Sequence, residues 1–209
     1  MRCLVAGLMV VAAGACGARE PVDREAFAAR ALDGYVTLPD VVLPDMHGEP
    51  YDLRAEGSGH ITLLFVGYTY CPDVCPVQLA NLGAVLRDYP LEVAPRVRTL
   101  FVTADPERDT PERLREWLGA LHGDFVGLRP TREQVNALEE ALEIPFSVVD
   151  PGAGPESYFV GHASQVLVFD EAGRARAAYP WGTRQQDWRR DLPRLVRGEW
   201  PMPVHSEGG

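Results

Sequence analysis

The chain has 209 residues, of which 46% are hydrophobic and 24% are charged. These proportions are typical of a folded globular protein with one domain, and they exclude a disordered or fibrous chain. The formal net charge is −10 and all 20 basic residues are arginine, so we expect no nucleic-acid partner, because two negatively charged surfaces repel each other.

An apolar stretch fills residues 3–15 near the N-terminus. A membrane-spanning helix needs about 20 apolar residues, so residues 1–15 are predicted to be the secretory signal of an exported protein. The sequence Ala13-Gly14-Ala15-Cys16 resembles the processing site of bacterial lipoproteins, which predicts lipidation of Cys16. The alternative is an ordinary signal peptide with a cysteine present by chance. Residues 16–35 are expected to be a tether between the membrane and the domain.

A hairpin, a strand and a helix are expected at the start of the domain. Val41–Leu43 and Tyr51–Leu53 flank the turn Pro44–Gly48, which predicts a β-hairpin. Ile61–Val66 is a continuous apolar run, typical of a strand buried on both faces. A helix is predicted after this run because leucines recur at helical spacing: Leu79, Leu82 and Leu86.

A strand and two capped helices follow in the middle of the chain. Residues 97–103 are the next apolar strand candidate. Asp109 or Thr110 precedes Pro111, and proline is favoured at the first position of a helix. Thr131, with a glutamine three residues later, predicts a capping box at the start of a further helix.

The last expected elements are a hairpin and a helix. Residues 165–169 and 174–179 are strand candidates joined by a four-residue turn that contains glycine. Thr183 begins a second capping-box pattern, and Pro193 is expected to kink or end the helix that follows.

The order of these elements predicts one α/β domain over residues 36–200, with a flexible tail over residues 201–209. Alternating strands and helices, followed by a hairpin and a helix, imply a mixed central β-sheet flanked by helices. A thioredoxin-like layout with an N-terminal β-hairpin satisfies this order.

Cys71 and Cys75 lie between the apolar strand and the next helix. Proline follows each of them and disfavours helical geometry at the preceding residue, so we expect Cys75 to cap the helix and Pro76 to begin it. A helix N-terminus favours thiolate over thiol, whereas Asp73 opposes it. Two such thiols form either a redox disulfide or a soft-metal site. A purely structural disulfide is disfavoured, because so small a loop constrains the unfolded chain little.

His162 immediately precedes the strand at residues 165–169, which runs antiparallel to the Ile61 strand in the expected layout. The start of one strand then lies beside the end of the other, so we expect His162 to face Cys71 and Cys75. The remaining histidines are expected to be ordinary surface or hydrogen-bonded residues: His47, His60, His122 and His205.

Asp105 follows the strand at residues 97–103 and is expected at the same edge of the sheet. There it would accept a hydrogen bond beside the thiols or belong to a docking surface. Glu107 and Asp109 are interpreted as ordinary loop carboxylates, and Arg108 is expected to pair with a nearby carboxylate.

Two thiolates and one imidazole predict a copper site. Thiolates suit Cu(I), and the imidazole allows the same site to hold Cu(II). Zinc is the competitor, but a structural zinc site requires a fourth protein ligand, and none is evident in the sequence. We therefore expect one copper ion bound by Cys71, Cys75 and His162.

Three motifs, Gly67–Pro76, Asp105–Pro111 and Gly161–Ser164, resemble those of the SCO/SenC family and occur in the family's order. The similarity covers residues 36–196. It implies a thioredoxin-like fold and the same three copper ligands. Asp105 corresponds to an acidic residue near the family's site that assists metallation or partner contact.

This family contains copper chaperones for cytochrome c oxidase assembly. The resemblance implies that the protein receives copper from an upstream copper donor and delivers it to the copper A centre of cytochrome c oxidase subunit II. Reduction of the cysteines of that centre is the other implied role. The resemblance also implies attachment to a membrane, facing the periplasm.

A thiol–disulfide oxidoreductase is the main alternative, because it would use the same Cys71 and Cys75. Two features favour the chaperone. The cysteine spacing is one residue wider than in thioredoxin-type redox motifs, and His162-Ala163-Ser164 stands where thioredoxins place a cis-proline. A peroxidase would instead need one low-pKa cysteine beside an activating arginine, and a copper sensor is not separated from a donor by sequence. We expect a metal donor rather than an enzyme, with thiol reductase activity left open.

Overall fold

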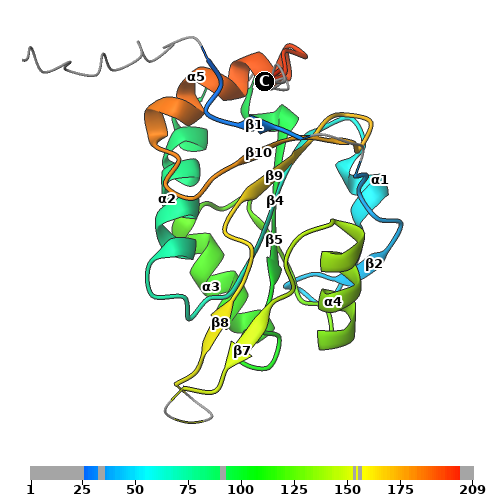
Figure 1. Ribbon diagram of the computed structural model, residues 1–209, viewed down its shortest axis with the longest axis vertical. Helices are drawn as coiled ribbons and strands as arrows, with labels where there is room; N and C mark the ends of the chain where they lie inside the picture. The colour runs from blue at the N-terminus through cyan, green and yellow to red at the C-terminus, as the bar shows by residue number, and fades with distance from the viewer. Residues whose placement is uncertain (1–25, 33–35, 90–92, 153, 155–156, 203–209) are drawn as a thin grey trace, which may run out of the picture.

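A computed structural model of the protein describes residues 26–32, 36–89, 93–152, 154 and 157–202. Its centre is a six-stranded sheet with the strand order β1–β10–β9–β4–β5–β6 (Figure 1). β4, β5 and β6 are parallel to one another, whereas β9 is antiparallel to β4, and β10 and β1 continue the sheet in antiparallel pairing. The strands are β1 (Arg30–Ala31), β4 (Ile61–Gly67), β5 (Val97–Thr103), β6 (Val126–Leu128), β9 (Val166–Phe169) and β10 (Ala175–Tyr179).

Helices cover both faces of this sheet, as predicted. They are α1 (Leu53–Gly57), α2 (Val74–Arg87), α3 (Pro111–Leu121), α4 (Arg132–Ala141) and α5 (Gln185–Val196), with a short 3₁₀ turn over Ala94–Arg96 before β5. α2 contacts α3 and α5 on one face, and α1 and α4 lie on the other (Figure 1).

Local signals that were read from the sequence account for much of this framework. All seven residues of β4 are buried, because a strand this apolar is stable only where both faces are covered. The Thr110 side chain accepts a hydrogen bond from the N–H of Arg113 at the start of α3. Thr131 and Gln134 form the predicted capping box at the start of α4.

Two hairpins lie outside the central sheet. The predicted one pairs β2 (Val42–Pro44) with β3 (Pro50–Asp52), and its turn contains Gly48 with φ +85°, a conformation that favours glycine. The other pairs β7 (Val148–Asp150) with β8 (Phe159–Gly161) and was not predicted. It projects from the end of the molecule opposite to β1 (Figure 1).

The start of α2 differs from the prediction. Asp73 is the N-cap residue, so Cys75 lies inside the first turn instead of capping the helix. Pro76 is tolerated there because the N–H groups of a first turn have no partner within the helix to lose. The expectation that Pro76 begins the helix is therefore wrong.

The start of α5 is also shifted from the prediction, by one residue. Arg184 is its N-cap, whereas Thr183 donates its hydroxyl to the carbonyl oxygen of Pro180 at 2.7 Å. The Thr183 side chain, which was predicted to cap the helix, is therefore engaged in a local hydrogen bond within the preceding turn.

Pro193 lies within α5 and does not end it. A proline has no N–H to donate to the carbonyl of Arg189 one turn earlier. The hydroxyl of Tyr89 donates to that carbonyl oxygen at 2.5 Å, so the freed acceptor has a partner.

Residues 26–32 pack against the domain, and the predicted tether over residues 16–35 is wrong in this part. β1 pairs with β10, and the N–H of Ala28 donates to Asp191 Oδ2 at 2.8 Å. Asp191 is fully buried, and its carboxylate satisfies a backbone donor that a free tether would leave to water.

The predicted signal over residues 1–15, Cys16 and most of the predicted tail lie outside the described residues. Among the helices of the described ranges, none combines the length and the hydropathy needed to cross a bilayer.

Candidate metal centre

The predicted ligands meet at one end of the central sheet, where the segment after β4 lies beside the segment before β9. β4 ends at Gly67 and leads to Cys71, and α2 carries Cys75 in its first turn. Because β9 is antiparallel to β4, His162 lies at the same end of the sheet. The Sγ atoms of both cysteines and one ring nitrogen of His162 all lie within 4.8 Å of one another. The fold thus brings together three residues that sequence reasoning proposed as ligands.

Both cysteines are free thiols with little exposure. Cys71 is 8% exposed and Cys75 is fully buried. The backbone N–H of Cys75 donates to Cys71 Sγ at 3.4 Å. This hydrogen bond comes from the first turn of α2, where the helix N-terminus stabilises negative charge.

Space for the Cys75 side chain depends on Gly67. A Cβ at this position would lie 2.8 Å from Cys75 Sγ and 3.0 Å from the Phe101 ring. Gly67 is therefore required here for close packing at the last residue of β4.

His162 presents one ring nitrogen to the thiols. Its Nδ1 lies 3.0 Å from the carbonyl oxygen of Ala163, and its Nε2 lies 3.4 Å from Cys75 Sγ. A carbonyl only accepts, so Nδ1 carries a proton, and Nε2 is the ring nitrogen that faces the cysteines and can serve as a metal ligand. The rings of Phe65 and Tyr68 pack edge-on against the imidazole at centroid distances of 5.8 and 5.7 Å. This packing limits rotation of the ring.

The pKa values of the two thiols are shifted in opposite directions. Hydrogen bonds from the Cys75 thiol, from His162 and from backbone N–H groups together lower the pKa of Cys71 to about 4, against the opposing effect of burial. Burial raises the pKa of Cys75 well above its ordinary value, and the neighbouring Cys71 thiolate raises it further. Without a metal, one thiolate and one thiol therefore share the site.

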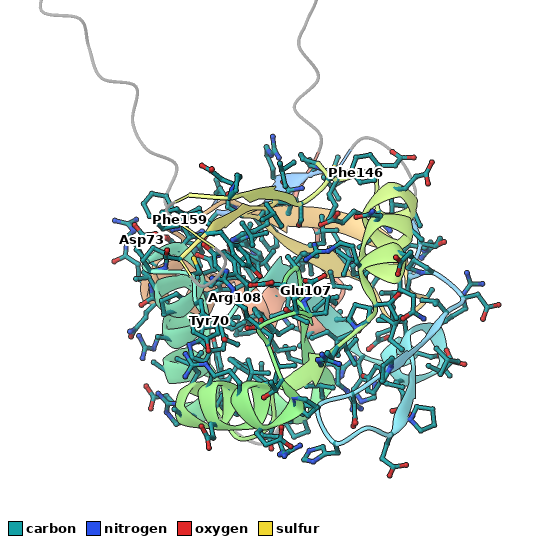
Figure 2. All side chains as sticks on the ribbon, turned by 90° about the horizontal axis from the view of Figure 1, so that it is seen from below. Tyr70, Asp73, Glu107, Arg108, Phe146 and Phe159 are labelled. Atoms are coloured by element: carbon teal, nitrogen blue, oxygen red, sulfur yellow. The ribbon has the colours of Figure 1, made fainter. Side chains whose placement is uncertain are left out.

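An open pocket of about 570 Å³ leads to Cys71 and His162 but is not lined by the buried Cys75. Its walls include Cys71 and His162, together with Asp73 and Phe159. Figure 2 looks onto this end of the molecule, where Tyr70 and Phe159 are 51% and 56% exposed. Cys71 and His162 can therefore be reached from this side.

Asp105 lies at the predicted edge but has other partners than the thiols. Its carboxylate accepts from Arg108 Nε at 2.5 Å and from the Tyr158 hydroxyl at 2.6 Å. The side chain is fully buried. The expected pairing of Arg108 with a carboxylate is confirmed. Tyr158 was not singled out in the sequence.

Asp109 was interpreted as an ordinary loop carboxylate, and this interpretation is wrong. The residue is fully buried. It accepts from the N–H and hydroxyl of Thr69 at 3.0 and 2.6 Å, and from the Thr103 hydroxyl at 2.6 Å. The signal available in the sequence was a threonine near the end of each of two adjacent strands: Thr103 is the last residue of β5, and Thr69 lies two residues after β4. Glu107, by contrast, forms a surface ion pair with Arg132, as expected for a loop residue.

Comparison with known proteins identifies one family. The pattern of the SCO1/SenC family matches residues 38–197. A putative copper-binding protein of Stutzerimonas stutzeri is 30% identical over 163 residues, covering 78% of each chain. An SCO2-like protein of Rickettsia prowazekii is 30% identical over 135 residues, which are 63% of each chain, just under two thirds.

Solved structures show the same fold. ScoI of Bradyrhizobium japonicum with copper bound aligns with a TM-score of 0.66 at 27% identity, covering 78% of this chain and 99% of that one. Apo Sco1 of Thermus thermophilus aligns with a TM-score of 0.67 at 30% identity, covering 83% and 95%. Yeast Sco1 with copper bound aligns with a TM-score of 0.68 at 25% identity, covering 86% and 96%. The predicted thioredoxin-like fold is confirmed.

Proposed function

Because the chain belongs to the SCO1/SenC family, we propose that it binds one copper ion through Cys71, Cys75 and His162 and passes the ion on as cargo. The observation that carries this proposal is the convergence of two sulfur atoms and one imidazole nitrogen within 4.8 Å. The copper-bound relatives named above support it, since they share the fold and the family.

The chemistry of the donor set fits copper. Two thiolates suit Cu(I), and the lone pair of His162 Nε2 adds a ligand that Cu(II) prefers. A structural zinc site needs four protein ligands, whereas the cluster found within the described ranges has three. A three-ligand set beside an open pocket also leaves room for an incoming ligand from a partner.

The destination that we propose is the copper A centre of cytochrome c oxidase subunit II, with loading by an upstream copper donor. We further propose that lipidation of Cys16, or the leader itself, holds the protein on a membrane with the domain facing the periplasm. β1 supports an arrangement in which the copper site faces away from this attachment, because β1 lies at the end of the molecule opposite to β7 and β8 (Figure 1).

Anaerobic titration of the protein with Cu(I) tests this function. One tightly held ion is expected for the parent protein and for His162→Ala, and its loss is expected for Cys71→Ser or Cys75→Ser. Absence of tight Cu(I) binding to the reduced parent protein would contradict the proposed function.

Reduction of a disulfide in the target is a second candidate function, and the acidity of Cys71 favours it. The Cys71 thiolate would attack the target disulfide and release one target thiolate, leaving a mixed disulfide. Cys75 would then lose its proton and attack Cys71 Sγ. This step releases the second target thiolate and forms the Cys71–Cys75 disulfide. His162→Ala is expected to separate disulfide exchange from Cu(II) binding but not from Cu(I) binding, because disulfide exchange does not need the imidazole as a ligand and two thiolates still suit Cu(I).

A further inference from the structure

Arg108 lies where the loop after β5 meets the hairpin that leads to His162. Its Nε donates to Asp105 Oδ2 at 2.5 Å, and its Nη1 donates to the carbonyl oxygen of Tyr158 at 3.1 Å. The Tyr158 hydroxyl donates back to Asp105 Oδ1 at 2.6 Å. These three hydrogen bonds form a closed ring of contacts, and Tyr158 immediately precedes β8.

Three tyrosine rings surround the same guanidinium group. Its Cζ lies 3.5 Å from the ring centroid of Tyr158, 5.0 Å from that of Tyr70 and 5.7 Å from that of Tyr68. Tyr70 immediately precedes Cys71, and the Tyr68 ring packs against His162. Arg108 therefore joins the segment that carries Cys71 to the segment that carries His162. Figure 2 shows Arg108 and Tyr70 at the end of the molecule that carries the site.

The position of Arg108 costs free energy. Its side chain is only 14% exposed, and Nη2 is buried without a hydrogen-bond partner in the described part of the chain. A buried ion pair is often replaced by well-packed apolar side chains without loss of stability. Packing alone therefore does not explain an arginine here. The guanidinium explains it, because its planar fork donates in two directions and its flat faces stack on aromatic rings.

We propose that Arg108 is a positioning residue that holds β8, and with it the His162 imidazole, against the Cys71 segment. This inference rests on the proposed copper-binding function. Cu(II) needs the imidazole more than Cu(I) does, so Arg108 sets the relative affinity of the site for the two oxidation states.

The adjacent Asp109 acts on the other half of the ligand set and provides a comparison. The carboxylate of Asp109 accepts hydrogen bonds from Thr69, two residues before Cys71. It takes no part in the three hydrogen bonds that join Asp105, Arg108 and Tyr158. Replacement of Asp109 by Asn is therefore expected to weaken Cu(I) and Cu(II) binding together, whereas replacement of Arg108 is expected to separate them.

The first experiment uses the metal-free, reduced full-length protein. In Arg108→Leu, backbone amide hydrogen exchange of β7 and β8 is expected to become faster, and the ring signals of His162 are expected to broaden. The matched control is Arg176→Leu, since Arg176 also pairs with an aspartate and lies 5.6 Å from an aromatic centroid, that of Trp200. Unchanged exchange of β8 and unchanged His162 signals in Arg108→Leu would overturn the proposal, whether or not copper binds.

The second experiment measures copper affinities by competition with chelators of each oxidation state. Substitution of a residue that orients a metal ligand costs ~10- to 100-fold in affinity, and we expect this loss for Cu(II) in Arg108→Leu. The change for Cu(I) is expected to be smaller. Arg108→Lys keeps the charge but not the planar fork, so it is expected to behave as Arg108→Leu. Equal losses for Cu(I) and Cu(II), or full rescue by lysine, would contradict the positioning role.

Tyr158→Phe keeps the test decisive if Arg108→Leu does not fold. It removes only the hydroxyl that donates to Asp105 and leaves the ring beside the guanidinium. A smaller loss of Cu(II) affinity in the same direction is expected, and an unchanged ratio of the two affinities would overturn the proposal. Failure of the parent protein to bind either ion would instead count against the proposed function, because the metal-free experiment is independent of copper.

Discussion

Cys75 and His162 are 87 residues apart in the chain, yet Cys75 Sγ lies 3.4 Å from His162 Nε2. The contact joins the first turn of α2 to the end of the β7–β8 hairpin. One sulfur and the imidazole are therefore brought together by tertiary structure, whereas the two sulfurs lie within a single local segment. Changes to the two parts of the ligand set should have different consequences.

His162→Ala is expected to weaken Cu(II) binding far more than Cu(I) binding, because two thiolates alone still suit the softer ion. Visible spectroscopy of the Cu(II) form and chelator competition for Cu(I) measure the two effects. His122→Ala is the matched control, since His122 stacks on Phe125 instead. Equal weakening of both oxidation states by His162→Ala would contradict the assigned role of the imidazole.

Gly67→Ala is expected to destabilise the protein, because the new Cβ would lie 2.8 Å from Cys75 Sγ. Overpacking of this kind costs about 1–3 kcal/mol in the free energy of unfolding, measurable by urea denaturation. Gly119→Ala in α3 is the control. It has open space around the position, so it is expected to stabilise the helix by about 0.5–1 kcal/mol. A neutral Gly67→Ala would show that Cys75 has room to shift.

The turn between β9 and β10 predicts a pH dependence of stability. Burial alone would raise the pKa of Asp170, but hydrogen bonds from the backbone N–H of Arg174, from its side chain and from the N–H of Ala172 lower it below the ordinary value. A carboxyl group with a lowered folded-state pKa stabilises the fold above its unfolded-state pKa of about 3.9, and this contribution disappears as the pH falls through the folded-state value.

Asp170→Asn tests this dependence through urea denaturation at several pH values. The variant is expected to be less stable than the parent near neutral pH, and the difference is expected to shrink steadily below about pH 4. A difference that stays constant down to pH 2 would mean that the charge of Asp170 does not contribute.

Much of the fold was predictable because its signals are local. The apolar run at Ile61–Val66, the capping box at Thr131 and the glycine turn after Asp170 each involve residues within a few positions of one another. The paired strands β7 and β8 carried no such signal. All three residues of β7 are exposed, so no alternation of apolar and polar side chains marks the strand.

The ligands of the site were predictable from the sequence, but the side chains that hold these ligands in place were not. Cys71, Cys75 and His162 are chemically distinctive, and strand order placed them at one edge. The contacts that support them are long-range, such as Thr69 with Asp109 and Arg108 with Tyr158, which are 40 and 50 residues apart. Charged side chains are rarely buried, so the burial of Asp105 and Asp109 could not be read from residue type.

The unequal acidity of the two thiols predicts selective alkylation in the reduced, metal-free protein. Cys71, with a pKa of about 4, is a thiolate at neutral pH and slightly exposed, whereas burial keeps Cys75 protonated. The thiolate is the reacting species, so Cys71 is expected to be modified first, at a rate that falls only as the pH approaches about 4. Mass spectrometry after short exposure to iodoacetamide identifies the modified residue.

Two variants complete the alkylation experiment. Cys75→Ala removes the largest cause of the lowered pKa of Cys71, so the pH profile of modification is expected to move to higher pH. In Cys71→Ser, the buried Cys75 is the one thiol left at this site, and it is expected to react slowly at neutral pH. Fast modification of Cys75 in that variant would mean that the first turn of α2 opens readily to solvent, and that the buried thiol is available for exchange with a partner.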